Sequence, residues 1–169
     1  SEMCIRDRGN IEIFGKPLSG FNAKDKQDLG VVLSDSGFSG YLTVNDIIPI
    51  MNNLYDKFDN SFFMNQVNKC QLPLNKRLKD FSTGMKAKLK VIAAISHNAK
   101  LLILDEPTAG LDPNERIRFR NLISELAEER LVLLSTHIVS DVEYIANEIL
   151  LMKDGQLIHK GCLLYTSDA

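Results

Sequence analysis

The sequence predicts an α/β fold with a mainly parallel sheet. Two apolar runs, residues 101–104 and 131–134, each end in polar residues, and a stretch of helical periodicity separates them. The first run, which is continuous and bounded by turn residues, is typical of a strand buried on both faces of a parallel sheet, and the second run is interpreted as another strand. The alternation of strand and helix patterns over residues 99–161 indicates the α/β class.

The expected elements form three regions. Residues 9–40 contain two short strand patterns, at 11–14 and 30–33, with polar residues between them. Residues 41–98 are helical in pattern, and the third region follows. No internal repeat or low-complexity segment interrupts this order.

The helical region contains two helix patterns before residue 80. Thr43 is a candidate cap for the first, and Pro49 is expected to kink or interrupt it because proline lacks a backbone amide hydrogen. The second pattern consists of apolar residues at helical spacing, namely Phe62, Phe63, Val67 and Cys70.

The third region is expected to end in a hairpin. Helices are predicted over residues 114–129 and 140–146, on either side of the second apolar run. Asp154-Gly155 is a strong signal for a tight turn between two strands. The strands that it joins are predicted over 149–152 and 156–159.

Three acids follow the first apolar run. Asp105 and Glu106 are adjacent, and Asp112 comes after a turn. The carboxyl end of a strand is the usual place for chemistry in an open α/β sheet. Neighbouring carboxylates at the edge of a core are costly unless a cation or a reaction needs them. An isolated pair is more often an acidic turn without a role, so a magnesium ligand at Asp105 and a base at Glu106 depend on the motifs around them.

Two of these motifs are a helix start and a histidine. Ser82 or Thr83 is expected to cap a helix that begins in the polar turn 81–85. The free amides and the dipole at such a helix start favour an anion such as phosphate. His137 stands at the end of the second apolar run. Taken singly, most helix starts of this kind are only caps, and most such histidines are packed or capping residues.

In combination, the motifs resemble those of the ATP-binding cassette (ABC) ATPases over about residues 9–161. Within that family the chain is most similar to the ATPase subunits of bacterial ABC-2-type exporters. The matches, in chain order, are residues 81–85 to the signature motif, 101–105 to Walker B, Glu106 to the catalytic glutamate, 109–112 to the D-loop and His137 to the switch histidine.

The resemblance implies an ABC-type P-loop NTPase fold, with ATP and Mg²⁺ as cofactors. Asp105 would hold Mg²⁺, Glu106 would orient or deprotonate the attacking water, and His137 would contact the γ-phosphate. The family places two such domains head to tail around two nucleotides. Residues matched to the dimer contacts would therefore be Ser82, Thr83 and Gly84, which serve the opposite subunit's nucleotide, and Asp112, which bridges the interface.

The resemblance also implies partners and a location. They are a membrane-spanning transporter subunit and a second ATP-binding subunit, on the cytoplasmic face of the cell membrane. The helical region would offer a groove to the membrane subunit, although sequence does not separate that groove from ordinary core packing. Two rivals stay open: a soluble ABC ATPase acting on ribosomes or DNA, and a non-enzymatic remnant.

The phosphate-binding motif of the family, G-x-x-x-x-G-K-[ST], is absent. In the nearest stretch, residues 9–17, the glycines are one residue too far apart and Pro17 replaces Ser or Thr. Residues 9–15 instead resemble the strand after the phosphate-binding helix. We therefore expect about the first third of the domain to precede this chain, and the chain alone to be inactive. Residues 1–8 and 162–169 follow no family pattern and are interpreted as non-native flanks.

The Q-loop also departs from the family. Residues 29–37 resemble it, but Ser34 stands where the family has glutamine, which binds magnesium and water and reaches toward the membrane partner. Ser34 is too short to do this alone. Asp35, one residue on, is a candidate metal ligand because a carboxylate is a good donor to a hard cation. Which of the two replaces the glutamine stays open.

Composition excludes several classes of protein. The 169 residues suit one domain, and 44% are hydrophobic. A net charge of −2 without a long basic run does not favour an extended nucleic-acid surface, so no nucleic-acid partner is expected. No run of 18 apolar residues is present. The three cysteines match neither a metal site nor a disulfide framework, which favours a reducing cytoplasm.

Overall fold

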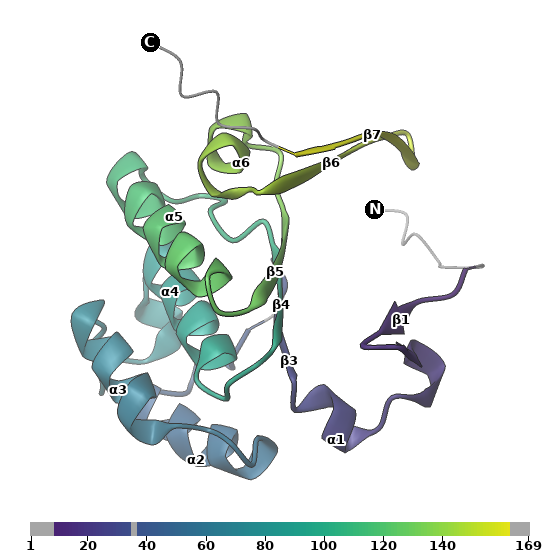
Figure 1. Cartoon of the computed structure of the whole chain (residues 1–169). Coiled ribbons are helices and arrows are strands. Elements are labelled where there is room, and N and C mark those ends of the chain that lie inside the picture. The colour runs from purple at the N-terminus through teal and green to yellow at the C-terminus, as the bar shows by residue number, and fades with distance from the viewer. Residues whose placement is uncertain (1–8, 35–36, 163–169) are drawn as a thin grey trace.

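The computed structural model describes residues 9–34 and 37–162. A three-stranded parallel sheet of order β3-β4-β5 lies at its centre, which confirms the α/β class (Figure 1). The elements are β1 (Glu12–Ile13), β2 (Lys16–Pro17), α1 (Ala23–Lys26), β3 (Leu29–Val32), α2 (Val44–Leu54), α3 (Asn60–Lys69), α4 (Thr83–Ile95), β4 (Leu101–Asp105), α5 (Pro113–Ala127), β5 (Leu131–Ser135), α6 (Val139–Ile145), β6 (Glu148–Lys153) and β7 (Gln156–Cys162).

The register of the sheet aligns the carboxyl ends of its strands. Asp105, the last residue of β4, pairs with Ser135, the last residue of β5. On the other side Val32 of β3 pairs with Leu104. Consequently the residues that follow these strands meet at one edge of the sheet, as expected for parallel strands.

Helix α4 connects two hydrophobic cores. One face places Leu89 and Ile92 among the side chains of α2 and α3. The opposite face places Val91 and Ile95 in a second core with the sheet and α5. A glycine on β3 permits this close approach, because a Cβ atom on Gly30 would lie 2.6 Å from the carbonyl oxygen of Ala94 and still nearer to a leucine of β4. The helix that begins at the signature turn is therefore fixed on both sides.

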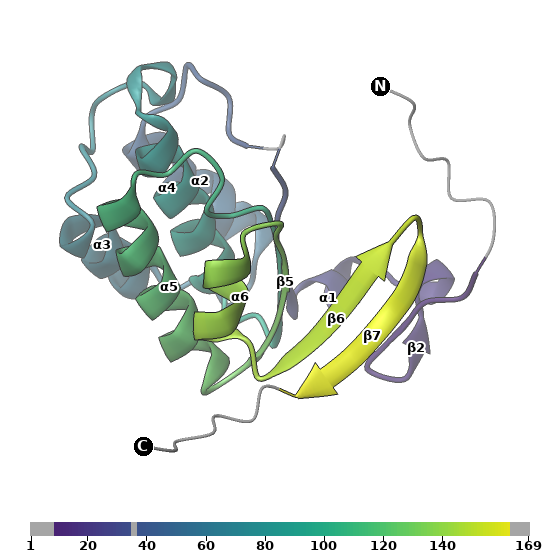
Figure 2. The same ribbon diagram turned by 90° about the horizontal axis from the view of Figure 1, so that it is seen from above.

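Long helices cover one face of the sheet. Figures 1 and 2 both show α3, α4 and α5 on one side of the central strands, and the two hairpins β1–β2 and β6–β7 beyond the other side. On that second face Val31, Leu131 and Leu133 are 48%, 64% and 53% exposed. The expectation of a strand buried on both faces is therefore correct for most of β4. The second apolar run forms the strand β5 as predicted, and its apolar residues alternate between half-buried and exposed.

The local predictions agree with the elements to within a few residues at their ends. Thr43 caps α2 in a reciprocal pair with Asp46. Pro49 lies inside α2 without interrupting it. The hairpin turn is also confirmed: Asp154 and Gly155 both have positive φ angles, of 50° and 74°, as the predicted turn requires. Among the residues described, no helix is long and apolar enough to cross a membrane.

His97, just after α4, is a buried histidine that makes stability depend on pH. It is 1% exposed, stacks on Tyr55 at a centroid distance of 3.8 Å, and its Nε2 lies 3.0 Å from the carbonyl oxygen of Leu29. Burial lowers the pKa of His97 below its usual 6.5, and the contact with Leu29 only partly opposes this. The folded protein thus resists protonation of a group that the unfolded chain protonates near pH 6.5.

We expect stability to be unaffected by His97 above about pH 6.5 and to fall as the pH drops below it, because the unfolded state then binds more protons. Urea unfolding at pH 7.5 and 5.5 measures the loss. A His97→Gln variant keeps an amide donor without a titration in this range, so it should lose less stability between the two pH values. An equal loss in both proteins would contradict the assignment.

Candidate functional site

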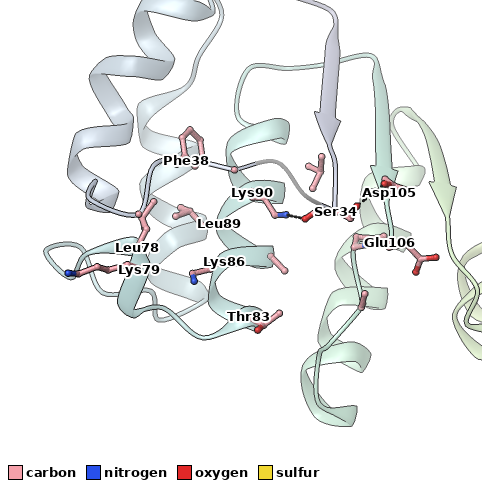
Figure 3. Close-up of a pocket in the computed structure, with 16 residues that line it drawn as sticks. Ser34, Phe38, Leu78, Lys79, Thr83, Lys86, Leu89, Lys90, Asp105 and Glu106 are labelled. Atoms are coloured by element: carbon pink, nitrogen blue, oxygen red, sulfur yellow. Dashed lines mark hydrogen bonds between the residues drawn. The ribbon is translucent and has the colours of Figure 1, made fainter. Parts of the chain in front are cut away.

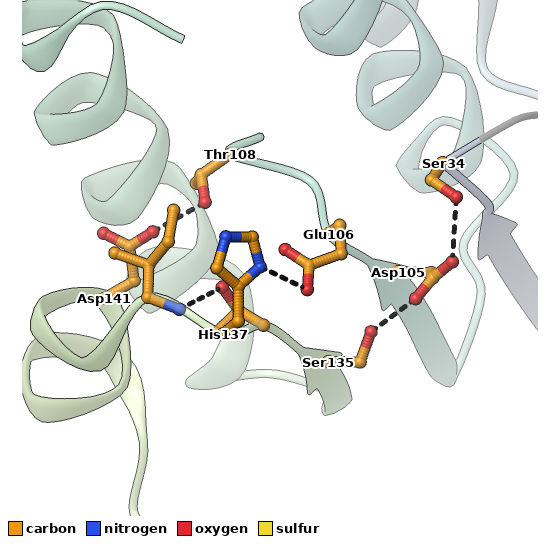
Figure 4. Close-up of polar contacts among 9 residues, drawn as sticks. Ser34, Asp105, Glu106, Thr108, Ser135, His137 and Asp141 are labelled. Atoms are coloured by element: carbon orange, nitrogen blue, oxygen red, sulfur yellow. Dashed lines mark hydrogen bonds and ion pairs between the residues drawn. The ribbon is translucent and has the colours of Figure 1, made fainter. Parts of the chain in front are cut away.

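Asp105 is held at the carboxyl edge of the sheet by two serines. Ser135 Oγ donates to Asp105 Oδ1 at 2.5 Å, and Ser34 Oγ donates to Oδ2 at 3.2 Å (Figure 4). The hydrogen bond from Ser135 is the main reason that the pKa of Asp105 is lowered; partial burial opposes this effect, and the contact with Ser34 adds to it. The side chain is thus a fixed carboxylate, and Ser34, the residue at the Q-loop glutamine position, contacts it directly.

Glu106 leaves the strand in an unusual backbone conformation. Its φ angle is +47°, and its amide donates to the carbonyl oxygen of Ser135 at 3.0 Å. Non-glycine residues in this region of φ are uncommon and cluster at functional sites. This conformation separates the side chain of Glu106 from that of Asp105, so the two neighbouring acids point in different directions in Figure 4.

The two carboxylate oxygens of Glu106 have different surroundings. Oε1 lies 2.8 Å from His137 Nδ1, although 31 residues separate the two in sequence. Oε2 is buried and has no hydrogen-bond partner among the described residues. His137 is itself 76% exposed. A buried acceptor of this kind needs a donor, and a bound water would supply one.

The signature turn packs against the D-loop. Ser82 is the N-cap of α4, and its hydroxyl accepts from the amide of Met85 at 3.2 Å. Gly110 has a φ of +72°, and a Cβ atom there would lie 3.3 Å from Thr83 Cγ2. A Cβ atom on Gly84 would lie 3.4 Å from a methyl group of Leu111. The two predicted nucleotide-contacting segments therefore form one surface.

Asp112 has a local role that the sequence did not assign to it. It is the N-cap of α5, and its Oδ1 accepts from the amide of Glu115 at 2.9 Å. Glu115 in turn forms a short ion pair with Lys88 of α4. The structure thus shows Asp112 as a helix cap at the end of the D-loop, and the predicted bridge between subunits stays a prediction.

A groove of about 620 Å³ lies between α4 and the edge of the sheet (Figure 3). Its walls come from the segment after β3, from α4 and from the loop after β4. Lys90 extends from α4 across one end and donates to the carbonyl oxygen of Ser34 at 3.3 Å. Asp105, Glu106 and Thr83 therefore share one cavity with the Q-loop segment.

The carboxylate ligands at this edge of the sheet suit a Mg²⁺ ion that is also bound to phosphate. Among the described residues no three Asp, Glu, His or Cys side chains converge as a complete metal site. Mg²⁺ bound with nucleotide uses one or two carboxylates and takes its other ligands from phosphate and water. Asp105, with both oxygens oriented by serines, is a suitable first ligand. Asp35, the second predicted ligand, lies outside the described residues.

Sequence reasoning missed several partners of the site residues. Ser135 stands two positions before His137, and the register of β4 and β5 would have identified it. A second pair, Thr108 and Asp141, is joined by a buried hydrogen bond of 2.6 Å. Nothing local in the sequence indicates that pair, because its members lie in different elements.

Comparisons with known proteins identify the family. A family model described as "AAA domain, putative AbiEii toxin, Type IV TA system" matches residues 43–140, more than half of the chain. The linearmycin resistance ATP-binding protein LnrL of Bacillus subtilis is 29% identical over 167 residues, 95% of this chain and 54% of that protein. The bacitracin transport ATP-binding protein BcrA of Enterococcus faecalis is 31% identical over 163 residues, 94% of this chain and 53% of that protein. The chain belongs to the ABC ATPase family.

Solved structures show the ABC ATPase fold. An ATP-binding subunit of an ABC transporter superposes with a TM-score of 0.78 at 24% identity, covering 93% of this chain and 68% of that one. An ATP-binding cassette in a dimeric post-hydrolysis state with ADP and Pi gives the same TM-score at 17% identity, covering 94% and 75%. The ABC chain described here spans about half the length of the curated relatives above.

Proposed function

We propose that the whole protein is the ATP-binding and ATP-hydrolysing subunit of an ABC exporter. The observation that carries the proposal is the convergence of Asp105, Glu106 and His137 at the carboxyl ends of two parallel strands. Relatives named for linearmycin resistance and bacitracin transport support a role in transport.

In the proposed reaction Glu106 is the general base. Its free Oε2 accepts a proton from the attacking water, while Oε1 remains in contact with His137. His137 is exposed at the same edge, where it can donate a hydrogen bond to the γ-phosphate. Phosphoryl transfer requires mainly positioning and charge stabilisation from the protein, and this pair supplies both.

Asp105 is the proposed magnesium ligand. A bound Mg²⁺ would neutralise charge on the phosphates during transfer. Ser135 and Ser34 keep the carboxylate oriented toward the edge of the sheet. Such supporting hydrogen bonds commonly change metal affinity by about 10- to 100-fold when they are removed.

We therefore expect Ser135→Ala to raise the Mg²⁺ concentration for half-maximal turnover by roughly 10-fold, at the lower end of that range. Ser34→Ala should have a smaller effect, because its contact is 3.2 Å long rather than 2.5 Å. Titration of ATPase activity with Mg²⁺ in the whole protein measures both values. A larger shift in Ser34→Ala would show that the Q-loop segment contributes more to the site than β5 does.

The proposed subunit works as a dimer beside a membrane-spanning partner. The signature turn, with Ser82, Thr83 and Gly84, would contact the nucleotide of a second ATP-binding subunit, and Asp112 would lie at the interface. The location proposed for the assembly is the cytoplasmic face of the cell membrane. The dimeric state of the cassette bound to ADP and Pi makes this arrangement reasonable for the same fold.

The phosphate-binding loop of the whole protein is proposed to lie in sequence that this chain does not span. The printed sequence contains no G-x-x-x-x-G-K-[ST] motif, and the chain covers about half of its relatives. The apolar sheet face at Val31, Leu131 and Leu133 is exposed here and has the character of a surface that other residues cover.

Nucleotide binding by two versions of the protein tests this function. Calorimetry and phosphate-release assays should show Mg²⁺-dependent ATP binding and hydrolysis by the whole protein. The chain of residues 9–162 alone should show neither micromolar affinity nor turnover. Where a membrane-spanning subunit is encoded beside the gene, the whole protein should also co-purify with that subunit. Absence of ATP hydrolysis by the whole protein in the presence of that subunit would refute the proposal.

A further inference from the structure

Two contacts of different character join the loop after β4 to the segment after β5, which consists of a short loop and the start of α6. The first is the pair Glu106–His137, which includes an exposed histidine. The second lies deeper: Thr108 Oγ1 donates to Asp141 Oδ2 at 2.6 Å, and the two residues are 1% and 0% exposed (Figure 4). Thr108 is two residues beyond Glu106, and Asp141 is four residues beyond His137.

Arg120 of α5 also contacts Asp141. Arg120 Nη1 lies 3.8 Å from Asp141 Oδ1 and donates to the carbonyl oxygen of Ser140 at 3.1 Å. The guanidinium group of Arg120 covers the ring of Tyr144 at 4.9 Å. A buried carboxylate is costly unless it is paired and hydrogen-bonded. Asp141 therefore has a strong preference for the arrangement in which both Thr108 and Arg120 reach it.

Local hydrogen bonds constrain the backbone on both sides of this contact. The amide of Ala109 donates to the carbonyl oxygen of Glu106 at 3.1 Å, which closes a turn around Thr108. The amide of Asp141 donates to Ile138 at 3.0 Å, which closes the first turn of α6. Displacement at Thr108 or Asp141 is thus transmitted over one turn to Glu106 or His137.

We propose that the Thr108–Asp141 hydrogen bond is the positioning contact that keeps His137 within hydrogen-bond distance of Glu106. Thr108 is a positioning residue in this role, since it acts on the reaction only through the geometry of that pair. The inference rests on the proposed ATPase function. No activity in the unmodified whole protein would refute that function, whereas full activity after loss of the hydroxyl would refute only the positioning role.

The test compares Thr108→Val, which removes the donor at nearly constant volume, with Thr108→Ser, which retains it. In the whole protein, kcat should fall roughly 10-fold in Thr108→Val while the KM for ATP stays unchanged, because misplaced catalytic groups lower the rate of the chemical step. Thr108→Ser should stay within about twofold of the unmodified enzyme, since a serine hydroxyl can make the same bond. A parallel loss in both variants would overturn the proposal.

A double substitution separates positioning from general destabilisation. In a His137→Ala background, Thr108→Val should reduce kcat no further, because the group that it positions is gone. If Thr108→Val lowers kcat in the His137→Ala background by the same factor as in the unmodified protein, Thr108 does not act through His137. If Thr108→Val does not fold, Thr108→Cys replaces it. A thiol is a weak hydrogen-bond donor of similar size, so kcat should fall in the same pattern but by a smaller factor.

Hydrogen exchange provides a readout that does not depend on activity. In the whole protein without nucleotide, amides of residues 136–141 should exchange faster in Thr108→Val than in Thr108→Ser. Amides of α3, which belong to the other core, should be unchanged and serve as the internal control. Unchanged exchange over residues 136–141 would overturn the proposal.

Discussion

Glu106→Gln in the whole protein is expected to lower kcat by roughly 100- to 10,000-fold, the range attributed to a general base. The amide has the shape of the carboxylate and can keep the contact with His137, but it cannot take a proton from water. Nucleotide affinity should be retained, because the phosphates are held by other groups. Single-turnover hydrolysis and calorimetry with ATP measure the two quantities separately.

The matched control is Glu128→Gln, the same chemical change on an exposed side chain at the end of α5. It should hydrolyse ATP at the unmodified rate. The Glu106→Gln protein should also accumulate as an ATP-bound dimer, since the step that ends the dimeric state is blocked. Turnover within about threefold of the unmodified enzyme would exclude Glu106 as the base.

Gly84→Asp is expected to abolish ATP-dependent dimerisation. Gly84 lies in the first turn of α4, on the surface that the signature turn shares with Leu111 of the D-loop. An aspartate there would face the γ-phosphate bound by the second subunit, and like charges in such an interface cost several kcal/mol. Acidic residues are favourable in the first turn of a helix, so the fold itself should be maintained. Light scattering with ATP in a Glu106→Gln background measures the dimer.

Gly84→Asn is the control for Gly84→Asp, because it adds almost the same volume without the charge. It should weaken the dimer less than the aspartate does. Binding of ATP to the separate subunit should be equal in all three proteins. A folded Gly84→Asp protein that still forms the ATP dimer would show that the signature turn does not face a second nucleotide.

Local patterns predicted those parts of the site that depend on neighbouring residues. The apolar run before Asp105 identified a strand and the position of the acids at its end. The helix cap at Ser82 and the hairpin turn at Asp154-Gly155 were predicted correctly, because each motif forms its hydrogen bonds within a few residues. The same reasoning placed His137 at a strand end, and the structure brings it to 2.8 Å from Glu106.

Contacts between distant segments could not be predicted from the sequence. The Ser34–Asp105 contact spans 71 residues and requires the pairing of β3 with β4. The Thr108–Asp141 bond requires the exact position of α6 against the loop after β4. The exposure of one face of β5 was not predicted, because burial of a strand depends on what covers each face of the sheet, and an apolar run contains no information on that.

The position of α4 between two hydrophobic cores has a consequence for how the molecule unfolds. Leu89 and Ile92 complete one core, and Val91 and Ile95 complete the other. Loss of the helix therefore exposes both cores at once. The α2–α3 region and the sheet should consequently lose structure in a single cooperative transition rather than as two independent units.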